Sequence, residues 1–207
     1  MSGNIDYYFT LVSPFAWMGH KPLLQIAGKH GVAINFKPVN LAGVWEVSGG
    51  VPPAQRTPTR QRYRLIELQR IAEQRGLHLN VVPQHFPTNP LLADCCVIAI
   101  IEAGGDPADF AFAVGEAVWS RQLQVADEAV IAELLEKCGH DPAAIIARGG
   151  TEEIIAKREA NTKAAIDADA IGSPAYVYKG EVFWGQDRLD LLDRMIGSGR
   201  EAYSSDF

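Results

Sequence analysis

Strand-like segments lie only near the two ends of the chain, and this distribution constrains the fold more than any other feature. Residues 5–12 (IDYYFTLV) and 33–39 (AINFKPV) are aromatic and β-branched, which is typical of buried strands. The pattern between them is helical from Ser13-Pro14 to His30, which predicts a strand–helix–strand unit with parallel strands. Residues 174–178 and 181–184 flank Lys179-Gly180 and predict an antiparallel hairpin, before a last helix over 189–196.

The middle of the chain, about 120 residues, is mostly helical in pattern. Its glycine- and proline-rich stretches, 40–58 and 83–90, predict a long loop and a second irregular segment. Neither end alone can bury both faces of its strands, so we expect the ends to form one four-stranded mixed sheet of an α/β fold. Residues 1–40 and 170–200 would then form one domain, and residues 41–169 an inserted all-helical domain. Helices are expected there over 60–74, 91–103, 108–119, 128–138, 142–147 and 152–168.

Composition excludes several classes of protein. The 207 residues are 47% hydrophobic with a net charge of −6, so the basic face of a nucleic-acid-binding protein is not expected. The longest apolar run, residues 95–101, is far shorter than the roughly 18 residues of a membrane span. The first residues lack the pattern of a signal peptide, so we expect a cytoplasmic protein. Three cysteines without a CxxC pair indicate packing residues rather than a disulfide framework or a metal site: Cys95, Cys96 and Cys138.

Ser13 is the first candidate for chemistry. It directly follows the first strand and precedes Pro14, so it would stand at a helix N-terminus and at the carboxyl end of a strand, where sheets of this kind bind ligands. The first-turn amides favour an anion, and a hydroxyl donor beside them would lower the pKa of a bound thiol. The alternative is that Ser13 only caps the helix.

Two further segments could recognise a peptide-like ligand. In Gly172-Ser173-Pro174, a cis Ser173–Pro174 bond would leave the Ser173 backbone free to pair with an extended peptide, whereas an ordinary trans proline would only begin a strand. The segment from Trp184 to Arg188 follows the last strand. Its amides could hold a carboxylate and Asp187 an ammonium group, or it could be a glycine turn with an aspartate cap.

Taken together and in this order, these segments resemble 2-hydroxychromene-2-carboxylate isomerases, which are close to kappa-class glutathione transferases in the thioredoxin superfamily. The resemblance is collinear over about residues 4–196. It is carried by Asp6-Tyr7-Tyr8-Phe9, Ser13-Pro14-Phe15-Ala16-Trp17, residues 43–53, Arg62-Tyr63 with Leu68, His85-Phe86-Pro87 with Asn89-Pro90, Ala117-Val118-Trp119, Gly172-Ser173-Pro174 and residues 184–189.

The resemblance implies a thioredoxin-like sheet and a glutathione-dependent cis–trans isomerase of an aromatic acid in naphthalene-type catabolism. Ser13 would activate the glutathione sulfur, and Ser173 and Pro174 would pair with the cysteinyl backbone. Gln186 and Asp187 would hold the γ-glutamyl end. We also expect a homodimer, because the helical insertion offers surface for one. Candidate contacts to the aromatic acid are Lys37, Arg62, Tyr63, His85 and Trp119.

Two departures from the family pattern bear on the substrate rather than the fold. Many relatives carry Asn where this chain has Ser48-Gly49-Gly50, and Asp where it has Thr10. Two other functions stay open, a kappa-like transferase or peroxidase and a non-catalytic binding protein on the same scaffold. Disulfide exchange at the start of the first helix is disfavoured because Ser13-Pro14-Phe15-Ala16 contains no sulfur.

Overall fold

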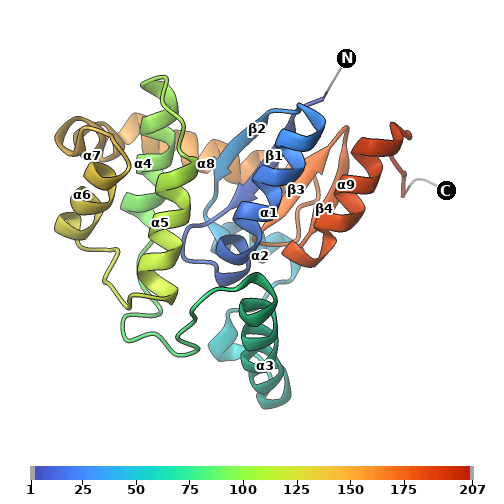
Figure 1. Ribbon diagram of the computed structural model, residues 1–207, viewed down its shortest axis with the longest axis horizontal. Helices are drawn as coiled ribbons and strands as arrows, with labels where there is room; N and C mark the ends of the chain where they lie inside the picture. The colour runs from blue at the N-terminus through green and yellow to red at the C-terminus, as the bar shows by residue number, and fades with distance from the viewer. Residues whose placement is uncertain (1–2, 206–207) are drawn as a thin grey trace.

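The two ends of the chain form one sheet in the computed structural model, which describes residues 3–205. Its strands are β1 (Ile5–Phe9), β2 (Ile34–Pro38), β3 (Ala175–Tyr178) and β4 (Glu181–Trp184), in the order β2-β1-β3-β4 (Figure 1). β1 pairs with β2 in parallel, whereas the β1–β3 and β3–β4 pairs are antiparallel. The four-stranded mixed sheet and the hairpin expected from the sequence are therefore confirmed.

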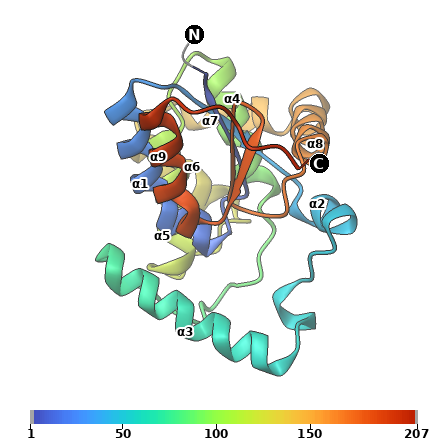
Figure 2. The same ribbon diagram turned by 90° about the vertical axis from the view of Figure 1, so that its right-hand side faces the viewer.

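Helices cover both faces of this sheet. α1 (Pro14–His30) and α9 (Leu189–Ser198) lie on one face, and α8 (Glu152–Asp167) with α2 (Leu41–Ser48) lies on the other, as Figure 2 shows. α4 (Leu91–Glu102), α5 (Ala108–Trp119), α6 (Glu128–Lys137) and α7 (Pro142–Gly149) gather beside the sheet (Figure 1). α3 (Pro58–Arg75) crosses below the body, and the short 3₁₀ turns η1 (Pro53–Gln55) and η2 (Gln186–Arg188) complete the elements. No helix within residues 3–205 is both long and apolar enough to cross a membrane.

The two faces of the sheet bury different side chains. Toward α1 and α9, Tyr7 stacks on Phe9 and Tyr176 with ring centroids 4.1 and 5.3 Å apart, and all three side chains are fully buried. Toward α2 and α8, smaller residues such as Ala175 and Val177 form a separate cluster. The alternation along each strand thus places one large aromatic layer under α1, the helix that begins at Ser13.

α2 and α8 both lie in the segment expected to be the insertion, and both cover the sheet. Two of the helices between residues 41 and 169 thus complete the layers around the strands. The domain boundaries drawn from the sequence stay a prediction.

Two local expectations were wrong. The stretch 40–58 is not a continuous loop, because α2 occupies residues 41–48. Val44 of α2 is buried, and Gly49 ends the helix with a left-handed backbone (φ 75°). The first strand ends at Phe9 rather than at residue 12, because the chain turns there and Ser13 N–H donates to the Thr10 carbonyl at 3.0 Å. Pro22 lies inside α1 without dividing it.

Candidate active site

Ser13 lies between the start of α1 and the loop before β3. Its Oγ accepts a hydrogen bond from Ala16 N–H at 3.2 Å, as an N-cap does, and donates to the Ser173 carbonyl at 3.3 Å. The residue is 7% exposed. The hydroxyl proton is therefore not needed by the helix cap and is directed toward the loop that carries Ser173.

Two hydrogen bonds join the loop before β3 to the loop after β1. Thr10 N–H donates to Ser173 Oγ at 3.1 Å, which complements the bond from Ser13 to the Ser173 carbonyl. The Ser173–Pro174 peptide bond is cis. Ser13 is 160 positions from Ser173 in the sequence, yet it meets Ser173 and the adjacent Pro174 at the carboxyl end of β1.

The first turn of α1 retains one free donor. Pro14 has no N–H, and Ala16 and Trp17 donate to Ser13. This leaves Phe15 N–H without a partner among residues 3–205. α1 has 17 residues and no acidic side chain in its first turn, so the partial positive charge at its start is not compensated within that turn. A hydroxyl donor and a free amide together favour a bound anion.

Gln186 and Asp187 lie in η2 and differ in burial. Gln186 is 4% exposed, and its Oε1 accepts a bond from Arg75 at 3.0 Å. α1 packs tightly on it, since a Cβ on Gly19 would lie 2.7 Å from the Gln186 Cβ. The Asp187 carboxylate is 60% exposed and pairs with Arg188 at 2.7 Å. The Gln186 side-chain amide, which is fixed by packing against α1, thus lies beside the accessible Asp187 carboxylate. This combination suits the ammonium and carboxylate groups of an α-amino acid.

The loop near Gly50 is filled by an indole ring. A Cβ on Gly50 would lie only 1.9 Å from Trp45 Cδ1, so the packing of α2 leaves no room for a side chain there. The same ring, with Trp184, flanks Gly172: a Cβ on Gly172 would lie 3.4 Å from Trp45 Nε1 and 3.0 Å from Trp184 Nε1. Two indole N–H groups therefore border the segment that carries Ser173.

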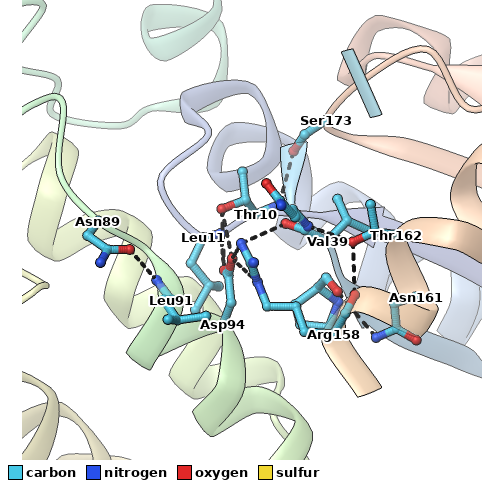
Figure 3. A network of polar contacts seen from close by, with 12 residues as sticks. Thr10, Leu11, Val39, Asn89, Leu91, Asp94, Arg158, Asn161, Thr162 and Ser173 are labelled. Atoms are coloured by element: carbon cyan, nitrogen blue, oxygen red, sulfur yellow. Dashed lines mark hydrogen bonds and ion pairs between the residues drawn. The ribbon is translucent and has the colours of Figure 1, made fainter. Parts of the chain in front are cut away.

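A buried ion pair connects α4, beside the sheet, and α8, on one of its faces, to the loops of the site (Figure 3). Asp94 of α4 is fully buried, and its carboxylate accepts from Leu11 N–H at 2.9 Å and from the Thr10 hydroxyl at 3.1 Å. Arg158 of α8 donates to Asp94 Oδ2 at 2.9 Å and to the Val39 carbonyl at 3.0 Å. The pair thus holds the loop after β1 and the end of β2.

Burial dominates the ionisation of Asp94. It raises the pKa of this carboxyl to about 6, although Arg158 and the hydrogen bonds favour the charged form. Sequence reasoning missed both residues. The signal for Asp94 was present, since it is the one charged residue in the otherwise apolar segment 91–101, and a buried charge requires a partner. No comparable signal distinguishes Arg158 from the other charged residues of α8.

The five residues expected to contact an aromatic acid are not gathered at one place. Lys37 of β2 pairs with Asp6 at 2.9 Å and lines a cavity of about 780 Å³ beside that strand. Trp119 of α5 is fully buried, and its Nε1 donates to the Val12 carbonyl at 3.2 Å, next to Ser13. The other three residues are exposed on α3 or half-buried in the loop before α4: Arg62, Tyr63 and His85.

The cysteines do not offer a reactive thiolate. Burial raises the pKa of Cys95 to about 11 and that of Cys96 to about 12, and it also raises the pKa of Cys138. All three are free, and Cys95 and Cys96 are buried as packing residues, as expected. A sulfur nucleophile at Ser13 would therefore have to come from a bound molecule.

Comparison with known proteins agrees with this geometry over nearly the whole chain. The family profile described as DSBA-like thioredoxin domain matches residues 4–197. A 2-hydroxychromene-2-carboxylate isomerase of Pseudomonas putida is 28% identical over 196 residues, 93% of this chain and 94% of that protein. Glutathione S-transferase kappa 1 of Rattus norvegicus is 23% identical over 205 residues, 93% of this chain and 90% of that protein. A solved structure of a 2-hydroxychromene-2-carboxylate isomerase has a TM-score of 0.80 at 25% identity and 94% coverage of each chain. The resemblance recognised in the sequence is confirmed.

Proposed function

The chain belongs to the DsbA-like thioredoxin family, and on that premise we propose that it is a glutathione-dependent cis–trans isomerase of 2-hydroxychromene-2-carboxylate or a related aromatic acid. The observation that carries this proposal is the Ser13 hydroxyl, whose proton is not used by the helix cap and whose Oγ donates to the Ser173 carbonyl at 3.3 Å. Similarity to an isomerase of this name over 93% of the chain supports the reaction class.

The site fits glutathione in three respects. Ser13 Oγ–H and Phe15 N–H are donors for a thiolate, and burial leaves the chain without an ionised cysteine that would compete. The Ser173 carbonyl can accept from a cysteinyl backbone when Ser13 turns to the sulfur. Gln186 and Asp187 offer a buried amide and an accessible carboxylate to the γ-glutamyl end.

When bound, glutathione would supply a thiolate that adds reversibly to the conjugated double bond of the acid, so that rotation about the resulting single bond can precede its departure. The tasks of the chain are electrostatic and positional. Ser13 would donate its hydrogen bond to the sulfur of bound glutathione and would keep its proton. The start of α1 favours the negative charge of the thiolate over the neutral thiol. Asp94 and Arg158 keep the loop that carries Ser13 in register with Ser173.

The test is isomerisation with and without glutathione. We expect turnover only with the tripeptide and a loss of about 100-fold or more in kcat for Ser13→Ala, the size seen when one donor to a reacting anion is removed. Ser198→Ala is the matched control, because Ser198 is an exposed serine at the end of α9. Equal turnover without glutathione, or full activity of Ser13→Ala, would contradict the proposal.

A kappa-like glutathione transferase is the second candidate, and the similarity to the rat enzyme favours it. The same thiolate site would then attack an electrophile and release a stable thioether. Mass analysis of the products with conjugation substrates separates the two functions, because an isomerase returns glutathione unchanged. The homodimer also remains a prediction, which light scattering after size-exclusion chromatography would test.

A further inference from the structure

Arginines without a carboxylate partner are concentrated in one stretch of the chain. Six of the twelve arginines form an ion pair within residues 3–205, namely Arg70, Arg121, Arg148, Arg158, Arg188 and Arg200. Five of the remaining six lie between residues 56 and 75, on α3 and just before it. In a chain of net charge −6, this stretch is the exception and would attract an anion.

Arg64 is the member of this group that lies against an aromatic surface. Its guanidinium carbon is 5.7 Å from the centre of the Trp119 ring and 6.0 Å from that of Phe86, and these two rings pack 4.7 Å apart. Trp119 in turn donates to the Val12 carbonyl, one residue before Ser13. One aromatic wall therefore supports both the guanidinium and the loop that carries the candidate catalytic hydroxyl.

The guanidinium has donors to offer. It forms no hydrogen bond or ion pair with any residue that the structure describes, and none of its nitrogens is both buried and unpaired. Partial burial and the charge of Arg56 lower the pKa of Arg64 to about 10, so the side chain stays protonated at neutral pH. A half-buried cation beside a second cation is stabilised when an anion binds.

We propose that Arg64 is a specificity-determining residue that binds the carboxylate of the aromatic acid, with the ring of the acid beside Phe86. The inference rests on the proposed function, because that function brings an aromatic acid next to Ser13. A carboxylate is planar and accepts two parallel N–H bonds from a guanidinium, which fixes its orientation as well as its position. The residue lies two positions from Arg62, which the sequence had indicated instead.

Turnover provides the first test. We expect Arg64→Met to raise KM for the acid by about 10- to 100-fold, with a much smaller change in kcat, because a uniform binding contact is lost. Met keeps the packing on Trp119 and Phe86. Arg64→Lys keeps the charge but cannot donate two parallel hydrogen bonds, so its KM should lie between those of the wild-type protein and Arg64→Met. Arg70→Met is the matched control, since Arg70 lies on the same helix, is exposed and pairs with Glu67 at 2.6 Å. A KM for Arg64→Met equal to that of the control would overturn the proposal.

Binding without turnover provides the second test and does not depend on the reaction. Cinnamate and cinnamamide serve as probes, with quenching of tryptophan fluorescence as the signal. Cinnamate should bind the wild-type protein at least tenfold more tightly than Arg64→Met, whereas cinnamamide should bind both alike. If the protein bound cinnamate in this way but isomerised nothing, the proposed function would fail and the carboxylate site would stand.

Glutathione and its glycine ethyl ester separate the two possible sources of a carboxylate. The proposal predicts that Arg64→Met binds both as well as the wild-type protein does, which also shows that the variant is folded. Weaker binding of glutathione alone, with cinnamate binding unchanged, would assign Arg64 to the glycine carboxylate of the tripeptide and overturn the proposal.

Discussion

Arg158 and Arg64 are each one residue removed from the loop between β1 and Ser13, the first through Asp94 and the second through Trp119, but they differ in the partners of their guanidinium groups. Arg158 is buried with Asp94, and its donors are occupied by that carboxylate and the Val39 carbonyl (Figure 3). Arg64 lies over two aromatic rings and bonds no oxygen within the described chain. A buried cation that is hydrogen-bonded to a buried carboxylate holds the fold together, whereas a cation that bonds no oxygen is available for a ligand. The first should therefore control stability and the second binding.

The largest effect on stability should come from Arg158→Met. It leaves the Asp94 carboxylate buried with no cation, which costs about 3–5 kcal/mol in comparable pairs. Urea unfolding measures the change. The double variant Asp94→Leu with Arg158→Met should recover much of the loss, because no charge is then buried alone. A loss below about 1 kcal/mol in the single variant would show that the pair does not hold the fold.

The pH dependence of stability should identify Asp94. Its folded-state pKa of about 6 lies above the value of about 3.9 for an unfolded aspartate, so the folded chain binds the proton more tightly. This contribution is fully present below about pH 4 and is lost as the pH rises through about 6.

Subtracting a matched variant isolates that contribution. His20 titrates in the same range with the opposite sign, because burial lowers its pKa to about 4. The difference in unfolding free energy between the wild-type protein and Asp94→Asn cancels the His20 contribution. The unfolding free energy of the wild-type protein minus that of Asp94→Asn should decrease as the pH rises from 4 to 7. An increase with pH would contradict the assignment.

Arg64→Met should cost little stability, in contrast to Arg158→Met. The lost cation–π contacts are worth about 0.5–1 kcal/mol at a partly exposed site, and relief of the repulsion from Arg56 offsets part of this. Thermal unfolding should therefore place Arg64→Met within about 1 kcal/mol of the wild-type protein. A loss as large as that of Arg158→Met would mean that Arg64 is structural and would remove the contrast between the two regions.

The smallest effect should come from Arg70→Met. Its side chain is 63% exposed and its pair with Glu67 spans one helical turn, so the expected loss is about 0–0.5 kcal/mol. Chemical unfolding measures it beside the other variants. A larger loss would disqualify Arg70 as the control for the ligand measurements.

The sequence predicted the fold well because its pattern is local. Strand and helix periodicities, the Lys179-Gly180 turn and the Ser13-Pro14 helix start are each specified within a few residues. α2 was missed because Gly49-Gly50 and Pro52-Pro53 follow it closely and read as part of a loop.

The site was predictable only in part, for the opposite reason. Ser13 and Ser173 could be brought together from the strand order, but the Asp94–Arg158 pair joins residues 64 positions apart through burial that no local pattern encodes. Arg62 and Arg64 differ by two positions on one helix, and only the packing of α3 against Phe86 and Trp119 distinguishes them.

The central claim is that Ser13 and the start of α1 keep the sulfur of bound glutathione ionised. The ultraviolet absorbance of the thiolate, titrated with saturating protein, tests it directly. We expect the thiol of glutathione bound to the wild-type protein to have a pKa below about 7.5, against about 8.5 for a free thiol. Ser13→Ala should raise the pKa of the bound thiol by about one unit. A bound thiol with the pKa of free glutathione in the wild-type protein would contradict the account.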